Sequence, residues 1–159
     1  MQNNPDAVSD ELLNLDLASV EIFDRDITDG RGREYYESSE ITRATVFRNK
    51  LSGTVGTFVQ GYQVDISLHG NEIAAICSCN TNRKICIHAI ALLYSWIFDG
   101  DDFLNISTVL QQIETLEKSS LVLIIKNIIR QYPGLADVFL ARDKAEWYEI
   151  DPEPDYPDL

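Results

Sequence analysis

Residues 77–96 read CSCNTNRKICIHAIALLYSW and contain all three cysteines of the chain and one of its two histidines. These residues form two pairs, each with one intervening residue: Cys77 with Cys79, and Cys86 with His88. Side chains two apart on a strand point to the same side, so the first pair can hold one ion together. The six residues between the pairs, NTNRKI, are rich in turn formers and can bring the second pair back to the first. Three thiolates and one imidazole would form the closed tetrahedral shell of structural zinc.

Other uses of cysteine fit this spacing less well. Cysteines that serve only as small hydrophobic residues are expected to be scattered along a chain. A redox pair usually has two intervening residues, and an odd number of cysteines leaves one thiol outside any set of disulfides. We therefore predict one structural Zn²⁺, bound by Cys77, Cys79, Cys86 and His88.

The residues around the predicted ligands suggest how the ion would be supported. Arg83 and Lys84, in the loop between the pairs, can offset the net charge of about −1 that zinc with three thiolates carries. Cys86 falls at the entry to a predicted helix, where the helix dipole is expected to lower its pKa. His69, distant along the chain, is expected at the surface rather than in the site.

The residues before the cysteines predict a small antiparallel sheet. From position 41 the chain is rich in β-branched and aromatic residues, and in 62–68 apolar residues alternate with polar ones, as in a half-buried strand. The sequence HGNE, at 69–72, indicates a turn. We expect three or four strands within 42–78, with the first cysteine pair at the end of the last strand.

Helices are predicted after the cysteines. Residues 87–98 are apolar all round, which indicates a helix buried on most sides. Two more helical patterns follow at 104–116 and 119–132, the second with Ser119 or Ser120 as its N-cap and Pro133 as its stop, and a last helix is expected within 134–150.

The N-terminal part predicts one helix and a loop. Apolar positions in 10–23 recur with a period near 3.6, and Ser9 or Asp10 could cap the resulting amphipathic helix. The stretch DITDGRGREYY, at 26–36, holds two glycines and is expected to be a loop.

Charge is concentrated at the two ends of the 159-residue chain, whose net charge is −13. Residues 1–30 hold eight acids and one base, and 143–159 hold seven acids and one base. This distribution argues against non-specific binding of nucleic acid but leaves room for a small basic site. The longest nearly uncharged run, 85–98, has 14 residues, fewer than the roughly 18 that span a bilayer, and no signal sequence opens the chain. We expect a cytoplasmic protein without a membrane partner.

In its cysteine pattern the chain resembles SWIM-type zinc finger proteins of the archaeal and bacterial type. The resemblance rests on C-x-C, C-x-H and the apolar helix, on GREYY at 32–36, and on LEKSSLVLIIKNIIRQYPGL, similar to the helical hairpin that often follows, and it covers roughly 30–137. It implies the same four metal ligands. Asn80 stands where the family often has proline, and Ile87 where it commonly has a basic residue.

These observations predict an α+β fold, in which a small antiparallel β-meander ends in the C-x-C/C-x-H zinc site and a C-terminal helical region follows. We expect an acidic N-terminal helical segment at 1–30, the meander and finger at 31–98, a helical extension at 99–148 and an acidic Pro-rich tail at 149–159.

The resemblance implies binding of protein or DNA. No nucleophile–base–acid set is legible, so we expect a non-catalytic interaction module without a small-molecule substrate. The first hypothesis is an adaptor in a protein complex with an unidentified partner, using the helix 87–98, Tyr35 and Tyr36, or the acidic tail. The alternative is a DNA-binding accessory protein in recombination, repair or transposition, for which the candidate contacts are Arg83, Lys84, Arg48 and Lys50.

Overall fold

The computed structural model describes residues 6–57, 59–70, 72–81 and 84–139. By internal packing the chain divides into two units, Met1–Gln112 and Ile113–Leu159. The first unit holds the sheet, the metal ligands and the hydrophobic core.

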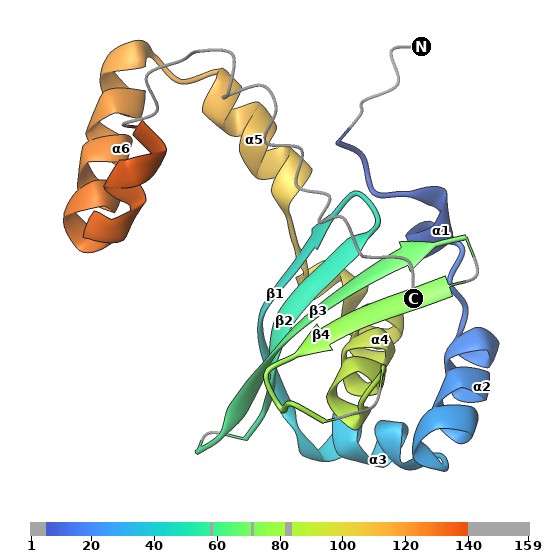
Figure 1. Cartoon of the computed structure of the whole chain (residues 1–159). Helices are drawn as coiled ribbons and strands as arrows, with labels where there is room; N and C mark the ends of the chain where they lie inside the picture. The colour runs from blue at the N-terminus through green and yellow to red at the C-terminus, as the bar shows by residue number, and fades with distance from the viewer. Residues whose placement is uncertain (1–5, 58, 71, 82–83, 140–159) are drawn as a thin grey trace. The chain divides into compact units, whose positions relative to one another are not determined.

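The first unit is built on a sheet with the strand order β4-β3-β2-β1-β5 (Figure 1). Its strands are β1 Glu40–Phe47, β2 Lys50–Gly56, β3 Gly61–His69, β4 Glu72–Cys77 and β5 Leu104–Asn105. The first four form the predicted antiparallel meander, and β5 pairs in parallel with β1. The predicted α+β class is confirmed, and β4 is left as an edge strand with one neighbour, β3.

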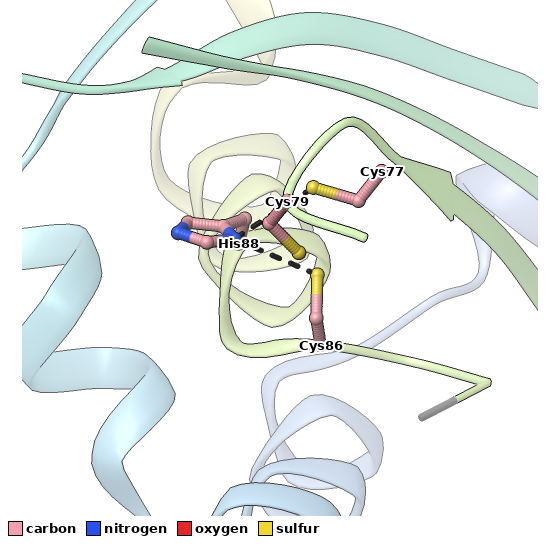
Figure 2. Close-up of side chains that lie close together, drawn as sticks. All are labelled: Cys77, Cys79, Cys86 and His88. Carbon is pink, nitrogen blue, oxygen red and sulfur yellow. Dashed lines mark hydrogen bonds between the residues drawn. The ribbon is translucent and has the colours of Figure 1, made fainter. Parts of the chain in front are cut away.

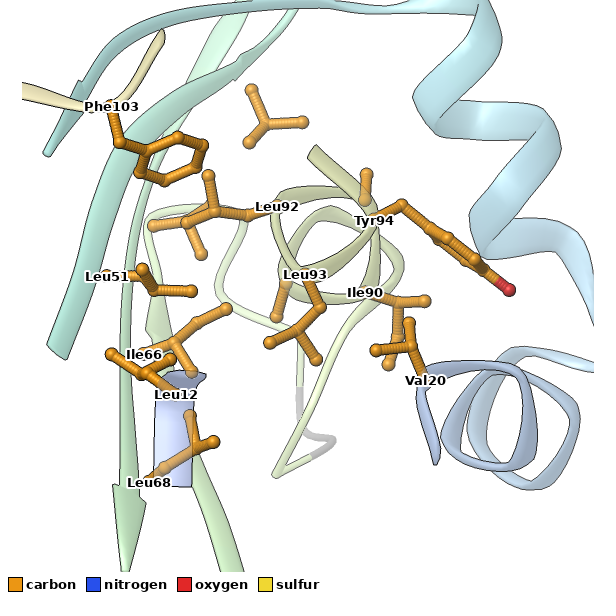
Figure 3. Packing of buried hydrophobic residues seen from close by; sticks show 14 of the residues in the cluster. Leu12, Val20, Leu51, Ile66, Leu68, Ile90, Leu92, Leu93, Tyr94 and Phe103 are labelled. Atoms are coloured by element: carbon orange, nitrogen blue, oxygen red, sulfur yellow. The ribbon is translucent and has the colours of Figure 1, made fainter. Parts of the chain in front are cut away.

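Helix α4, Ile87–Asp99, packs between the sheet and two N-terminal helices, α2 Leu17–Thr28 and α3 Arg31–Ser38. Leu92 points from α4 towards the sheet, whereas Tyr94 points towards the opposite side (Figure 3). Residues 88–95 of α4 are all buried, as the apolar sequence predicts. Because these side chains form the core of their own domain, this part of α4 does not provide the partner surface considered above.

The predicted helix at 10–23 is broken into two. Helix α1 spans Asp10–Leu13, and α2 starts only at Leu17. Ser9 caps α1, accepting a hydrogen bond from the Leu12 backbone N–H at 3.4 Å. Asp16 caps α2, since its carboxylate accepts from the Ser19 N–H at 2.8 Å. The second cap starts a new helix where the apolar period alone suggested continuity.

The predicted loop at 26–36 is wrong, because α2 continues to Thr28 and α3 begins at Arg31. Asp29 and Gly30 turn the chain with left-handed backbone angles, φ 58° and 79°. The buried Asp24 carboxylate then accepts hydrogen bonds from the N–H groups of Gly32 at 2.7 Å and Arg33 at 3.1 Å. A side chain of the preceding helix thus satisfies the first turn of α3, which local sequence rules do not anticipate.

The remaining elements are η1 Gly100–Asp102, α5 Ile106–Glu114, α6 Lys118–Gln131 and η2 Pro133–Phe139. The N-cap of α6 is Glu117, so the prediction of Ser119 or Ser120 is wrong, and α6 ends just before Pro133 as predicted. The predicted helix within 134–150 is a 3₁₀ helix up to Phe139, and its remainder and the tail lie outside the described residues. None of the helices in the described ranges is long and apolar enough to cross a membrane.

Candidate metal centre

The predicted ligands come from the end of one strand and the start of one helix. Cys77 is the last residue of β4, and Cys79 lies in the turn that follows. Cys86 is the N-cap of α4, and His88 lies in its first turn. The three thiols and the imidazole face one another (Figure 2), and their ligand atoms all lie within 4.8 Å of each other.

The spacing of these atoms fits one tetrahedral zinc ion. The His88 Nδ1 atom lies 3.7 Å from the sulfur of Cys77 and 3.7 Å from that of Cys86. A tetrahedral ion with ordinary Zn–S and Zn–N bonds separates a sulfur from a nitrogen ligand by about 3.6 Å. Nδ1 is therefore the ring atom placed to bind the metal, and the site would hold one structural Zn²⁺.

The turn after Cys77 depends on Asn80. Its backbone is left-handed, with φ 51°, and its N–H donates to the Cys77 carbonyl at 3.3 Å. Proline could provide neither the positive φ nor the N–H donor. Asparagine tolerates this conformation better than most residues. Asn80, where the family often has proline, therefore fits a turn that proline could not form.

Two tyrosines hold the ring of His88 in place. Tyr62 of β3 lies against it with ring centroids 4.1 Å apart and planes inclined by 30°. Tyr35 of α3 meets it edge-on at 5.0 Å and 79°. With aromatic neighbours from two separate elements, the imidazole can rotate little, and its Nδ1 stays directed at the three sulfurs.

Burial at the site opposes ionisation of the ligands when no cation is present. It raises the pKa of the Cys77 thiol to about 12, raises that of Cys86, and lowers the pKa of His88, which favours the neutral imidazole that a metal needs. For Cys79, burial also raises the pKa, but hydrogen bonds, first from the Thr81 backbone N–H, outweigh it and the net shift is downward. The expected lowering of the Cys86 pKa by the helix entry is thus overridden, and a bound cation would be needed to keep all three thiolates.

Comparison with known proteins identifies this segment. The family model of the SWIM zinc finger matches residues 62–97. Residues 62–97 form a SWIM zinc finger. The match covers β3 from Tyr62, β4, the four ligands and most of α4. Comparison of the chain with curated proteins and with solved structures gives no significant match.

The GREYY segment at 32–36 supports the SWIM finger from α3. Gly32 packs against Ile90 of α4, Tyr35 contacts the ligand His88, and Tyr36 donates a hydrogen bond to Asp99 at 2.7 Å. Both tyrosines were candidates for partner contacts, yet their rings are engaged within the domain. The supporting role of Tyr62 was not predicted, because its strand alternation indicates only that it faces the core side.

The candidate DNA contacts do not form one cluster in the described structure. Lys84 is exposed and lines a small cavity of about 80 Å³ with Cys77 and Cys86, while Arg83 lies outside the described residues. Arg48 and Lys50 lie at the β1–β2 turn, whereas Cys77 is two strands away on β4 and in register with Gly53, three residues along β2 from Lys50. Arg48 also pairs with Asp6 at 2.9 Å. His69, at the end of β3, is outside the ligand group, as expected.

Proposed function

We propose that the chain is a non-catalytic zinc-binding interaction module that acts as an adaptor in a protein complex. The observation that carries the proposal is the composition of the metal site. Three thiols and one imidazole complete a tetrahedral shell, so a bound zinc keeps no position for water or substrate. Closed sites of this kind stabilise structure, whereas catalytic zinc sites retain an open position.

The place of the site in the fold supports a structural role for the ion. Zinc would join the end of β4 to the start of α4, across a connection whose described residues include several without regular structure. The N–H groups of Ala89 and Ile90 donate to the Cys86 carbonyl at 3.1 Å and 3.2 Å, so Cys86 closes the first turn of α4. A cation held by Cys86 and His88 would therefore fix this helix end against the sheet.

An adaptor needs a surface that other proteins can bind. The buried α4 and the engaged tyrosines are used internally, but large apolar side chains remain exposed elsewhere in the first unit, among them Leu13, Ile22 and Ile76. Within the second unit, α6 and its surroundings expose Leu123, Ile124 and Ile128. Exposed apolar groups of this size, when contiguous, are typical of protein interaction sites.

The adaptor role can be tested by partner capture from the native source of the protein. The tagged full-length chain and its His88→Ala variant are cross-linked and purified in parallel, and co-purifying chains are identified by mass spectrometry. We expect a defined partner with the wild type and a strong loss with the variant, whose zinc content is measured separately. Equal capture by both proteins, or nucleic acid as the main co-purifying species, would contradict the adaptor role.

DNA binding is the second proposal, and the exposed Lys84 beside the ligands is the observation in its favour. Fluorescence anisotropy of a labelled duplex, measured with the full chain at two salt concentrations, tests it. Direct binding would weaken steeply as salt rises, because counterion release drives it. Lys84→Glu would weaken it further. The pairing of Arg48 with Asp6 and the net charge of −13 make this the less favoured proposal.

A further inference from the structure

The edge of β4 offers free backbone hydrogen-bonding groups. In the antiparallel pair β3–β4, Ser78 N–H donates to the Gln63 carbonyl at 2.9 Å, and Leu68 N–H is directed instead to Asn49 on the far side of β3. Hydrogen-bonded and non-hydrogen-bonded pairs alternate along such a ladder. The N–H and C=O groups of Ile73 and Ala75 therefore point away from β3, and no described residue hydrogen-bonds to them.

Within the described ranges, this edge carries little of the usual protection against pairing with another strand. Protected edge strands carry lysines, prolines or bulges, or are covered by a helix or loop. β4 has the sequence EIAAIC, pairs in unbroken register with β3 and has one charged residue, at its first position. Ile76 is 59% exposed on its outer face. The connection to α4 lies beside the last part of the strand, where Thr81, Lys84 and Cys86 line a cavity of about 80 Å³ with Ala75 and Cys77. The strand is thus open to addition of a further strand from its start to its middle.

An apolar groove lies beside this edge. It has a volume of about 600 Å³, and its apolar lining comes from the sheet and from the segment of α1 and α2: Leu15, Ile22, Phe23, Leu68 and Ile73. Ile73 is one of the two residues whose backbone is free, and its side chain faces the groove. β4 is the last strand on one side of the sheet, and Figure 1 shows α2 on that same side. One more strand paired with β4 would therefore cover the apolar side chains that α2 exposes there.

The charge around the groove indicates what kind of strand could bind there. Asp10 and Glu11 line it together with Asn14, Ser19 and Gly70, and none of its described lining residues is basic. The surrounding segment 1–30 holds eight acids and one base. A second copy of the same acidic chain would be repelled here, whereas a basic segment would be attracted.

We propose that the β4 edge and this groove bind an extended segment of a partner protein, with apolar residues at alternate positions and a lysine or arginine at the end next to α1. Its backbone would pair with Ile73 and Ala75, as in other cases of strand addition. Its apolar side chains would cover Ile22, Phe23 and Ile73, and its basic group would meet Asp10 and Glu11. The inference rests on the proposed adaptor function and names the surface through which it would act.

The test uses synthetic peptides and the zinc-loaded full chain. The probe is a fluorescein-labelled peptide, KVTVTVK, whose valines alternate and whose two ends are both basic, so that either strand direction is served. The matched control is EVTVTVE. We expect saturable binding of the lysine peptide in anisotropy titrations, and binding of the glutamate peptide that is at least about ten-fold weaker.

Two variants assign the binding to the groove. Ala75→Pro removes an outward N–H and no bond to β3, and edge strands tolerate proline at such positions, so we expect at least about ten-fold weaker peptide binding with zinc content unchanged. Ala74→Thr, on the exposed face of the same strand, is the matched control and should bind normally. If Ala75→Pro does not fold, the double variant Asp10→Asn, Glu11→Gln replaces it, and it should weaken the lysine peptide and leave KVTVTVK and EVTVTVE with similar affinities.

The proposal is overturned if neither peptide binds, if both bind equally to the wild type, or if binding persists in Ala75→Pro and in the charge-neutralised variant. It is also overturned if sedimentation shows a dimer that Ala75→Pro dissociates, because the edge would then serve a second copy of the chain. Partner capture that persists when peptide binding fails would leave the adaptor function intact and place its surface elsewhere.

Discussion

At the scale of single residues, the position of α3 depends on one glycine and one carboxylate. A Cβ atom on Gly32 would overlap Ile90 Cγ2 and lie 2.6 Å from Asp24 Oδ1. Asp24 itself is 2% exposed and accepts hydrogen bonds from two N–H groups of α3, from Thr28 and from the Tyr94 hydroxyl. Because α3 carries Tyr35 onto His88, these two residues also influence the metal site.

Replacing Gly32 by alanine should therefore destabilise the domain. We expect Gly32→Ala to lower the free energy of unfolding by about 2–3 kcal/mol, since the added methyl group has no room between two packed helices. Urea denaturation followed by circular dichroism measures it. Gly134→Ala is the matched control, because nothing lies within 4 Å of a Cβ at that position. Equal stability of the two variants would show that α3 and α4 separate easily.

Asp24 makes the stability depend on pH. Burial raises its pKa, but the hydrogen bonds from Thr28, Gly32, Arg33 and Tyr94 outweigh that effect, so the pKa in the folded protein is below its ordinary value. The stabilisation is therefore present above the unfolded pKa of about 4 and is lost as pH falls below it. We expect Asp24→Asn to lower the free energy of unfolding near pH 7 by about 2 kcal/mol. In acid the wild type loses this stabilisation itself, so the free energies of unfolding of variant and wild type should differ less. A difference that stays constant between pH 7 and pH 3, in urea titrations, would contradict this.

Separate substitution of the two histidines should show that His88 binds the metal and that His69 does not. His88→Ala removes one of the four ligands and should lose the zinc, measured by elemental analysis of the purified protein, with a fall in thermal stability. His69→Ala is the matched control and should keep one zinc per chain, because His69 lies at the exposed end of β3. Zinc released by His69→Ala but retained by His88→Ala would reverse the ligand assignment.

At the scale of elements, the metal site fastens β4 to α4, while the sheet and helices have a core of their own. That core includes Leu51, Val64 and Ile66 from the strands and Leu92 and Leu93 from α4, all almost fully buried. Figure 3 shows Leu51 and Ile66 facing Leu92 and Leu93. The ligand connection instead contains half-buried and exposed residues. Removal of zinc should therefore loosen the connection more than the rest of the domain.

This expectation can be measured by hydrogen exchange before and after treatment with a strong chelator. We expect faster exchange for the amides of Cys79 and of Ala89–Ile90, at the turn and the start of α4, and little change for β2 and for residues 92–95. Reloading with zinc should restore the slow exchange. Complete loss of protection throughout the sheet would show that the ion contributes to folding of the whole domain, as in small zinc fingers.

The sequence predicts those elements whose cause is local. The alternation in 62–68, the apolar run at 87–98 and the paired ligand spacing all match the structure, because strand, buried helix and metal shell each impose a short repeat. Helix α3 was missed because its N-terminal N–H groups are satisfied by Asp24, eight and nine residues earlier. The two-residue β5 exists only through its pairing with β1, and the tyrosines around His88 come from α3 and β3. Such long-range contacts leave no periodic signal in the chain.

At the scale of the whole molecule, the first unit contains every residue of the described hydrophobic core, from Leu12 to Phe103, and all four metal ligands. Its N-terminal segment is part of that core: Leu12 is 1% exposed, and its carbonyl accepts a hydrogen bond from the Trp96 indole at 3.0 Å. The start of α5 is attached in the same unit, since Ser107 donates a hydrogen bond to the Asp6 carbonyl. The acidic N-terminal segment thus contributes to the stability of the fold as well as to the charge of the groove.

Truncations at the two ends should consequently have opposite effects. In a chain that ends at Gln112, α5 is shorter by its last two residues, which are exposed. This chain keeps the whole first unit, so it should bind one zinc and have a melting temperature within a few degrees of that of the full chain. A chain that begins at Leu17 loses Leu12 and its bond to Trp96, and should be less stable by about 2–5 kcal/mol, as for removal of a large core side chain. Scanning calorimetry with parallel zinc analysis measures both. Failure of the chain ending at Gln112 to fold would contradict the assignment of the core to the first unit. Full stability of the chain beginning at Leu17 would contradict the contribution of Leu12 to that core.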